Sequence, residues 1–254
     1  VDAVRAAWCP PGPWRGQALH DALLEALARN GFTKPTPCQA ACLPLACARG
    51  KDVVCAAETG SGKTLAFALP ALHDVFSSGA PGVRALALAP TRELAKQIER
   101  HCAALLDPSK TDAEKRKLVC AVVGGLSEKK QERVLAAAPS IVVATPGRLR
   151  ELVEGGFAGT VRDALEQRTL RFLVLDEADR LLEPGAFGDL ELLEKAFFRD
   201  DDRRPRKRWQ TLVFSATLAV KAAGAPLSKK SRTKRTDRGV LDPAALLKRV
   251  EPLR

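Results

Sequence analysis

The chain has 254 residues, 46% of them hydrophobic, so it can bury one substantial core, which small and aliphatic side chains must fill because aromatics are only 5%. Its net charge of +11 lies almost wholly in residues 201–254, which hold 15 Lys or Arg against 5 Asp or Glu, so a broadly positive core is excluded. No apolar run approaches the roughly 18 residues of a membrane span, and no segment resembles a signal peptide, so we expect no membrane partner.

In chain order, short apolar runs alternate with segments of helical periodicity. The runs predict strands at Val53–Ala57, Arg84–Ala89, Lys117–Val123, Ile141–Ala144, Phe172–Asp176 and Gln210–Ser215. The other segments predict helices at Lys63–Phe76, Thr91–Leu106, Glu128–Ala137, Arg148–Glu154 and Phe187–Phe198. Continuous apolar strands separated by helices are typical of a parallel sheet covered on both faces. The predicted fold class is therefore α/β, with a doubly wound parallel sheet.

This alternation also suggests the domain boundaries. We assign residues 31–220 to one domain, residues 1–30 to an N-terminal flanking segment and residues 221–254 to a basic tail or linker, largely disordered. Asp107–Lys117 is charged and contains a proline, which predicts an exposed loop. Because the sequence opens at Val1 and contains no Met, we expect a fragment or a processed product.

Seven cysteines are spread along the chain, at Cys9, Cys38, Cys42, Cys47, Cys55, Cys102 and Cys120. None of them forms a C-x-x-C pair, the spacing at which two thiolates commonly chelate zinc. Cys38, Cys42 and Cys47 have near-helical spacing among apolar residues. We therefore favour buried, reduced thiols over a metal site or a disulfide, and with them a reducing compartment.

A glycine-rich turn follows the first predicted strand and opens a helix. Its residues are Ala57, Glu58, Thr59, Gly60, Ser61, Gly62, Lys63 and Thr64. The glycines allow backbone N–H groups to surround phosphate oxygens, Lys63 would neutralise the β and γ phosphates, and the Thr64 hydroxyl would ligate Mg²⁺. Ala57 stands where such P-loops usually have their first glycine. The turn predicts a nucleotide site.

An acidic run, Asp176-Glu177-Ala178-Asp179, ends the strand predicted at Phe172–Asp176. Asp176 would hold Mg²⁺, directly or through water, because an acidic residue after a buried strand is the usual partner of a P-loop metal. Glu177 would orient and deprotonate an attacking water. Taken alone, the run would only start a helix, since carboxylates stabilise helix N-termini.

Three further strand-to-helix turns carry small, hydroxyl or cationic residues, at Pro90–Ala95, Gly124–Gly125 and Thr145–Arg148. Free backbone N–H groups, helix N-termini and an arginine suit phosphate oxygens. Helix capping alone would explain any single turn.

These motifs, together with Gly31-Phe32-Thr33-Lys34-Pro35-Thr36-Pro37-Cys38-Gln39, resemble the DEAD-box family of ATP-dependent RNA helicases in the family's order, over about residues 7–217. The resemblance implies a RecA-like P-loop domain that binds ATP and Mg²⁺. It implies that Gln39 bonds the adenine edge with both faces of its amide and that Phe32 packs nearby. Lys63, Asp176 and Glu177 would then be the catalytic residues.

The same resemblance implies contacts with the backbone of single-stranded or structured RNA, largely independent of sequence. The implied RNA contacts are Arg92, Gly125, Thr145, Pro146, Gly147 and Arg148. Asp179, Ser215 and Thr217 would couple hydrolysis to unwinding, although small side chains at Ser215–Thr217 would also suit tight packing.

Family members have two RecA-like domains, and nothing after Thr217 reads as another, so the second is expected downstream in a complete protein. The isolated chain would then bind ATP and RNA weakly and hydrolyse slowly. Ala7-Trp8, Ala56-Ala57-Glu58 and the segment 183–190 resemble a nucleolar branch that acts in large ribosomal subunit assembly, while Trp8 and Trp14 would equally serve as anchors. The resemblance implies the nucleus and nucleolus, with the cytoplasm as the alternative.

Two other functional classes stay open. A helicase-like assembly factor without turnover is opposed by the presence of Lys63, Thr64, Asp176 and Glu177. A P-loop switch protein or DNA translocase is opposed by Gln39 and the turn at Thr145–Arg148. The basic run Lys229–Arg235 would be a nuclear address, an RNA tether or a solvated linker.

Overall fold

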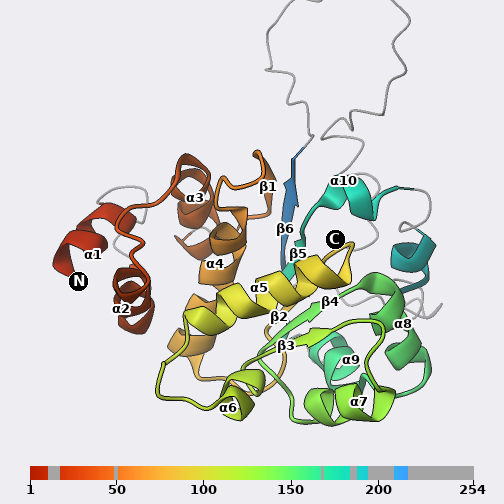
Figure 1. Ribbon diagram of the computed structural model, residues 1–254. Helices are drawn as coiled ribbons and strands as arrows, with labels where there is room; N and C mark the ends of the chain where they lie inside the picture. Colours follow the sequence, from red (N-terminus) through yellow and green to blue (C-terminus); the bar gives the residue numbers. More distant parts are fainter. Residues whose placement is uncertain (11–17, 49–50, 167–168, 184–187, 194–208, 217–254) are drawn as a thin grey trace, which may run out of the picture.

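In a computed structural model of the chain, residues 1–10, 18–48, 51–166, 169–183, 188–193 and 209–216 are described. They contain a six-stranded parallel sheet in the order β1-β6-β5-β2-β4-β3 (Figure 1). The strands are β1 (Val53–Ala56), β2 (Ala85–Leu88), β3 (Val119–Val122), β4 (Ile141–Ala144), β5 (Phe172–Leu175) and β6 (Gln210–Ser215). The fold class and all six strand positions are confirmed.

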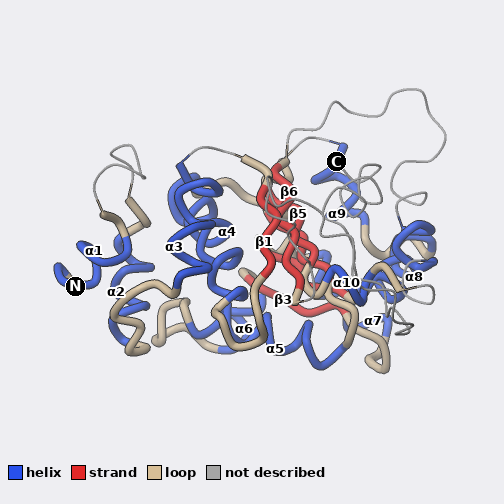
Figure 2. The backbone as a smooth tube through the Cα atoms, turned by 90° about the horizontal axis from the view of Figure 1, so that it is seen from above, coloured by secondary structure: helices blue, strands red, loops and turns tan. Residues whose placement is uncertain are grey.

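Helices cover both faces of the sheet, with α1–α4 on one side of the strands and α7, α8 and α10 on the other (Figure 2). On the first face lie α1 (Asp2–Trp8), α2 (Asp21–Arg29), α3 (Pro37–Leu43), the π-helix η1 (Pro44–Ala48), α4 (Lys63–Ser78) and α5 (Arg92–Ala104). The second face carries α7 (Glu128–Ala136), α8 (Pro146–Glu154), α9 (Gly159–Glu166) and α10 (Ala178–Leu181). No helix of the described part is long and apolar enough to cross a membrane.

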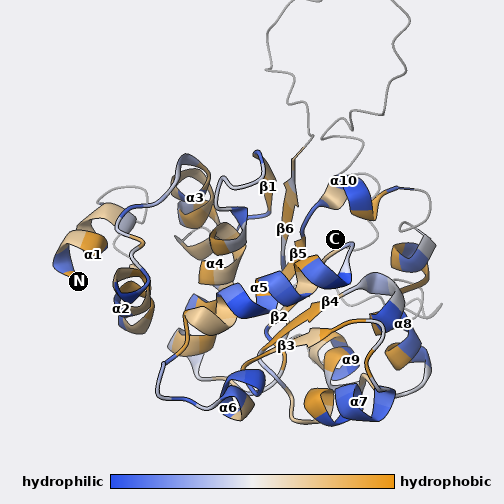
Figure 3. Cartoon of the chain, viewed as in Figure 1, coloured by the Kyte–Doolittle hydropathy of each residue, from blue (hydrophilic) through white to orange (hydrophobic). Residues whose placement is uncertain are grey.

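The two hydrophobic cores arise from the two-residue period of the strands. In β2, Ala85 and Ala87 belong to the core under α1–α5, whereas Leu86 and Leu88 belong to the core under α7–α10. Both sets are buried, so β2 is apolar throughout (Figure 3). This explains why a continuous apolar run, and not an alternating one, predicted it.

Four of the five predicted helices are observed with bounds that differ by at most two residues, whereas α1, α2 and α9 were not predicted. The helix expected at Phe187–Phe198 is helical at residues 188–193, and its remaining residues lie outside the described part. A short helix, α6 (Asp112–Arg116), occupies the stretch where we predicted an exposed loop. Thr111 starts it with a capping box to Glu114, a local signal that the charge and the proline obscured. Its residues are solvent-exposed or half-buried, as expected.

The N-terminal flanking segment is folded onto the domain where it is described. Leu23, Leu24 and Leu27 of α2 are fully buried in the first core. The Trp8 side chain is 1% exposed, and its indole N–H donates to the Phe32 carbonyl at 3.0 Å. Trp8 therefore anchors the segment, whereas Trp14 and the basic tail lie outside the described residues.

Candidate functional site

The carboxyl ends of β1 and β5 open into a pocket of about 700 Å³. In a parallel sheet these ends share one edge, which brings together turns that are distant in sequence. Its lining includes the predicted Phe32, Gln39, Thr59, Gly60, Gly62, Lys63, Thr64, Asp176 and Glu177. The structure thus gathers the expected base, phosphate and metal groups around one hollow.

The glycine-rich turn owes its shape to two left-handed residues, Gly60 at φ 83° and Gly62 at φ 87°. A β-carbon on Gly62 would lie 2.4 Å from the Gln39 Nε2, so this glycine also permits a close approach between the turn and α3. Lys63 begins α4 and is buried, with its ammonium donating to the carbonyls of Ala57 at 2.5 Å and Glu58 at 2.9 Å. The cation is therefore held across the turn.

Gln39 is buried and links the start of α3 to the glycine-rich turn, which we call the phosphate turn because it is predicted to bind phosphates. Its Oε1 accepts from the Thr36 backbone N–H at 2.8 Å as part of the capping box that starts α3. Its Nε2 donates to the Gly62 carbonyl at 2.9 Å. A primary amide has two donors and two acceptor sites, so one of each is left for a ligand. Phe32, 42% exposed, offers an aromatic surface in the same pocket.

The acidic pair lies at the end of β5. Asp176 is 3% exposed, and burial raises the pKa of its carboxyl to about 6, while the Glu177 N–H donates to its Oδ1 at 3.0 Å. Glu177 caps α10 at φ 47°, a left-handed conformation that is costly for a residue with a side chain. Its carboxylate, half-buried, accepts from Arg180 at 3.2 Å.

The Thr64 hydroxyl and the Asp176 carboxylate line the same pocket, and both are the hard oxygen ligands that Mg²⁺ prefers. A buried carboxylate whose charge is disfavoured by its surroundings is also one that a cation would stabilise. These residues therefore fit a magnesium ion.

A second hollow, of about 340 Å³, lies beyond β2, β4 and β3 at the same edge of the sheet. It is lined by Pro90, Arg92, Gly124, Thr145, Pro146, Gly147, Arg148, Glu151 and Asp189. Arg92 is the first residue of α5 and donates to the Gly124 carbonyl at 3.1 Å. Gly125, at φ 74°, would place a β-carbon 2.3 Å from the Arg92 Nη1. The three separate turns thus form one surface.

Arg148 differs from the other residues of this surface. It is 9% exposed, and its Nη1 bonds Glu128 at 3.0 Å and Glu151 at 2.8 Å, while Nη2 donates to the Leu126 carbonyl. Its guanidinium therefore ties α8 to the turn after β3. Glu151 lies three residues further along the same helix, whereas the contact with Glu128 depends on the fold. The direct RNA contact expected of Arg148 stays a prediction.

Of the three expected coupling residues, Asp179 and Ser215 lie in the described part of the chain. Asp179 lies in α10 and Ser215 ends β6, two elements that pack together. Thr217 lies outside the described residues. The proposed hydrogen bond between the Ser215–Thr217 hydroxyls and Asp179 stays a prediction.

Cys55, which the sequence did not associate with Cys38 and Cys42, meets both of them next to the phosphate turn. The sulfurs of Cys38, Cys42 and Cys55 all lie within 4.8 Å of one another. Hydrogen bonds from Cys38 and Cys42, aided by the charge of Lys63, lower the pKa of the Cys55 thiol. Cys55 stands in β1, 17 residues from Cys38, so spacing along the chain carried no signal of this contact.

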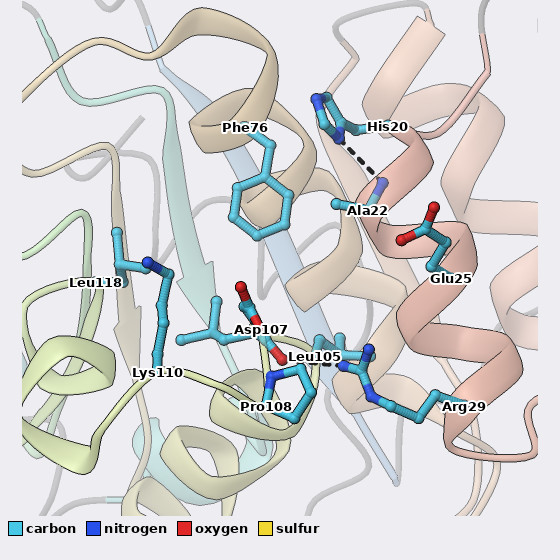
Figure 4. Close-up of a pocket in the computed structure, with 11 residues that line it drawn as sticks. His20, Ala22, Glu25, Arg29, Phe76, Leu105, Asp107, Pro108, Lys110 and Leu118 are labelled. Atoms are coloured by element: carbon cyan, nitrogen blue, oxygen red, sulfur yellow. Dashed lines mark hydrogen bonds between the residues drawn. The ribbon is translucent and has the colours of Figure 1, made fainter.

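Another hollow, of about 430 Å³, separates α2 from the segment that follows α5 (Figure 4). Glu25 and Arg29 face Asp107 and Lys110 across it, and Arg29 donates to the Leu106 carbonyl at 2.9 Å. It contains none of the predicted site residues.

A P-loop beside an acidic strand end, on a doubly wound parallel sheet, defines a RecA-like nucleotide-binding domain. The sequence profile of the DEAD/DEAH box helicase family matches residues 36–224. The chain belongs to this family.

Relatives and solved structures agree with this membership. DEAD-box ATP-dependent RNA helicase 13 of Oryza sativa is 43% identical over 82% of this chain and 28% of its own length. ATP-dependent RNA helicase MAK5 of Lodderomyces elongisporus is 38% identical, over 84% of this chain and 25% of its own. The chain thus spans about a quarter of the curated relatives it matches.

Among solved structures, Mss116p bound to ssRNA and AMP-PNP is similar with a TM-score of 0.68 and 28% identity, covering 92% of this chain and 41% of that one. A DEAD box protein from Methanococcus jannaschii gives a TM-score of 0.63 and 30% identity, covering 81% and 50%.

Proposed function

We propose that this chain is the ATP-binding domain of an ATP-dependent RNA helicase, and that it hydrolyses ATP to ADP and phosphate while it holds RNA. The observation that carries this proposal is that two hollows, each lined by predicted site residues, lie at the same edge of one sheet. The first gathers Gln39, Lys63, Asp176 and Glu177, and the second gathers the three turns around Arg92.

The pocket residues divide between base and phosphates. The free donor and acceptor of Gln39 would bond the adenine edge, with Phe32 against the ring. Backbone N–H groups of residues 58–64 would bind the phosphates at the start of α4. Lys63 would exchange its two carbonyl acceptors for phosphate oxygens, which it binds more strongly because they are charged.

Glu177 would act as the general base. Its position beside Asp176 and opposite the phosphate turn suits a carboxylate that orients water and accepts a proton from it. Thr64 and Asp176 would hold Mg²⁺, which, when bound, would neutralise phosphate charge. Arg180 now pairs with Glu177, so a nucleotide-bound state in which Glu177 acts on water requires that this pair loosen.

The second hollow would bind the sugar–phosphate backbone of RNA. Arg92 is available at its rim, and Thr145 and Gly147 start α8, where N–H groups face outward. We assign Arg148 a supporting part in this proposal, since its charge is balanced by Glu128 and Glu151. Binding of this kind would not depend on base sequence.

The whole protein would need a second RecA-like domain to complete the ATP site. An arginine supplied by such a partner is worth about 10³–10⁵ in rate in related phosphoryl transfer. The nucleolar branch that the sequence resembles favours a part in ribosome biogenesis, in the nucleus and nucleolus. The basic tail would then serve as a nuclear address or an RNA tether.

Competition binding tests the proposal on the chain as it exists. A fluorescent ATP analogue should bind the chain, ATP should displace it, and GTP should not, because Gln39 reads the adenine edge. Lys63→Ala should weaken binding at least about tenfold, since it removes charge-assisted bonds worth roughly 1.5–3 kcal/mol. Lys129→Ala provides a control that should bind the analogue as the wild type does, because Lys129 is an exposed residue of α7 that does not line the pocket.

Several outcomes would contradict the proposal. A preference for GTP would favour a P-loop switch protein, and stimulation of hydrolysis by duplex DNA in place of RNA would favour a translocase. ATPase turnover by this chain equal to that of a two-domain helicase would remove the need for a second domain.

A further inference from the structure

Three sulfur atoms converge beneath the phosphate turn. Cys38 and Cys42 lie in α3 and Cys55 in β1, and the sulfurs of Cys38 and Cys55 are 3.2 Å apart. All three sulfurs lie within 4.8 Å of one another. Within the described part of the chain, this is the one group of three or more His, Cys, Asp or Glu side chains with such spacing.

The convergence follows from the local structure. Cys38 and Cys42 are four residues apart on α3, so they share one face of the helix. That face packs against β1, where Cys55 is half-buried. The register is fixed by the bonds from Gln39 and Thr36 to the P-loop, which hold the start of α3 against the end of β1.

The spacing of these sulfurs suits a soft metal ion. Four-coordinate zinc binds thiolates at about 2.3 Å, which places tetrahedral sulfurs about 3.8 Å apart. The observed separations, from 3.2 Å to at most 4.8 Å, bracket this value. Thiolates select zinc or monovalent copper over the oxygen-seeking cations that suit Asp176 and Thr64. Cys42 is buried, and the residues Cys38 and Cys55 are half-buried.

We propose that Cys38, Cys42 and Cys55 form a binding site for one soft, thiophilic metal ion of the zinc or monovalent copper class. Each thiol that enters the site as S–H releases its proton to solvent when its sulfur binds the metal. Three sulfurs leave a fourth position for water on zinc and complete a trigonal set on monovalent copper. The ion joins α3, which carries Gln39, to β1, which leads into the P-loop.

A disulfide between Cys38 and Cys55 is the competing chemistry. It would use only two sulfurs, and would require them to close from 3.2 Å to about 2.05 Å under an oxidant. The third sulfur, from Cys42, has no part in such a bond but completes a metal site. The sequence disfavoured a metal because it lacks C-x-x-C, yet one i,i+4 pair and a strand residue supply the same number of thiolates as many zinc sites.

Zinc titration of the full chain under a non-thiol reductant, with a chromogenic chelator as competitor, tests the site. We expect one zinc per chain. The variant Cys38→Ala/Cys42→Ala/Cys55→Ala should bind at least about 100-fold more weakly, since loss of outer-shell partners alone costs 10–100-fold. The matched control, Cys9→Ala/Cys102→Ala/Cys120→Ala, also removes three thiols and should keep its zinc.

A spectroscopic test on the unaltered chain does not require that any variant folds. Cobalt(II) should give thiolate-to-metal charge-transfer absorption that zinc displaces, and zinc should raise the thermal midpoint by several degrees. Absence of this absorption in reduced protein would overturn the proposal. Equal zinc binding by both triple variants would also overturn it, as would loss of two free thiols with no bound metal. None of these results depends on ATP binding, so the proposed function fails or stands separately.

Discussion

At the scale of single residues, Asp176 is the group whose chemistry depends most on its surroundings. Its place after an apolar strand made it a candidate metal ligand, but only the fold shows that it is 3% exposed. Burial raises the pKa of its carboxyl to about 6, above the roughly 3.9 of an exposed Asp. The protein thus keeps a carboxylate ready for a cation at a cost to its own stability.

That cost can be measured through Asp176→Asn. A raised pKa in the folded state favours the protonated form, so this group's contribution to stability is complete below pH about 4 and is lost as pH rises through about 6. Without metal or nucleotide, the free energy of unfolding of the variant should exceed that of the wild type by roughly 1–3 kcal/mol above pH 7. Urea unfolding in the presence of a chelator should show that this difference in the free energy of unfolding disappears near pH 4. A gain that is constant with pH would exclude the carboxyl charge as its cause.

Glu177 offers a second test at this scale. Glu177→Gln keeps the side-chain size and the strained backbone at φ 47° but removes the proton acceptor. Hydrolysis under single-turnover conditions with RNA present should fall about 10²–10⁴-fold, while the affinity for the ATP analogue should stay within a few-fold. A variant that hydrolyses normally would show that another group accepts the proton.

At the scale of elements, the P-loop and the start of α3 form one unit. Thr36 donates to the Ser61 carbonyl at 2.7 Å, and Gln39 donates to the Gly62 carbonyl at 2.9 Å. The helix cap is therefore also a clamp on the phosphate turn. The cysteine group lies beneath the same contact, so a bound metal would reinforce this unit.

Two glycines of this unit give a matched pair of substitutions. Gly62→Ala meets the Gln39 Nε2 at 2.4 Å, whereas Gly60→Ala meets nothing within 4 Å, and both have positive φ. Both substitutions should lower the free energy of unfolding by about 1–2 kcal/mol, because alanine is strained at positive φ. Only Gly62→Ala should also displace Gln39. Its affinity for ATP, measured by titration, should therefore be lower than that of Gly60→Ala. Equal affinities for the two variants would refute the clamp.

The turn after β3 provides a corresponding test of the proposed RNA-binding surface. Gly125→Ala would push the Arg92 Nη1, which lies 2.3 Å from the new β-carbon, and break its bond to Gly124. Binding of a single-stranded RNA should weaken by about tenfold, as expected for one charged contact, with ATP affinity unchanged. Gly82→Ala has similar backbone strain, with φ 87° and nothing within 4 Å, and should bind RNA as the wild type does.

At the scale of the whole molecule, the N-terminal helices belong to the fold. Trp8 is buried in the first core and donates to the Phe32 carbonyl, so α1 supports one wall of the pocket that we propose binds the nucleotide. The contact spans 24 residues and crosses the boundary that the sequence suggested near residue 30.

Trp8→Ala should therefore affect both stability and ligand binding. Loss of a buried indole should reduce the free energy of unfolding by about 3–5 kcal/mol, seen as a lower urea midpoint. Affinity for the adenine nucleotide should also fall, because Phe32 loses its support. Val1→Ala is the control, since Val1 is 57% exposed in the same segment. A normal nucleotide affinity in folded Trp8→Ala would separate the helix from the pocket.

The sequence by itself determined the sheet, because strands buried on both faces read as apolar runs, and it determined the local turns, because Gly62, Lys63 and Thr64 act within a few residues of one another. Tertiary structure decided what depends on side chains brought together from distant segments. It brought Glu128 to Arg148, and it placed Cys55 beside Cys38. Such contacts are set by strand order and helix packing, which no spacing along the chain encodes.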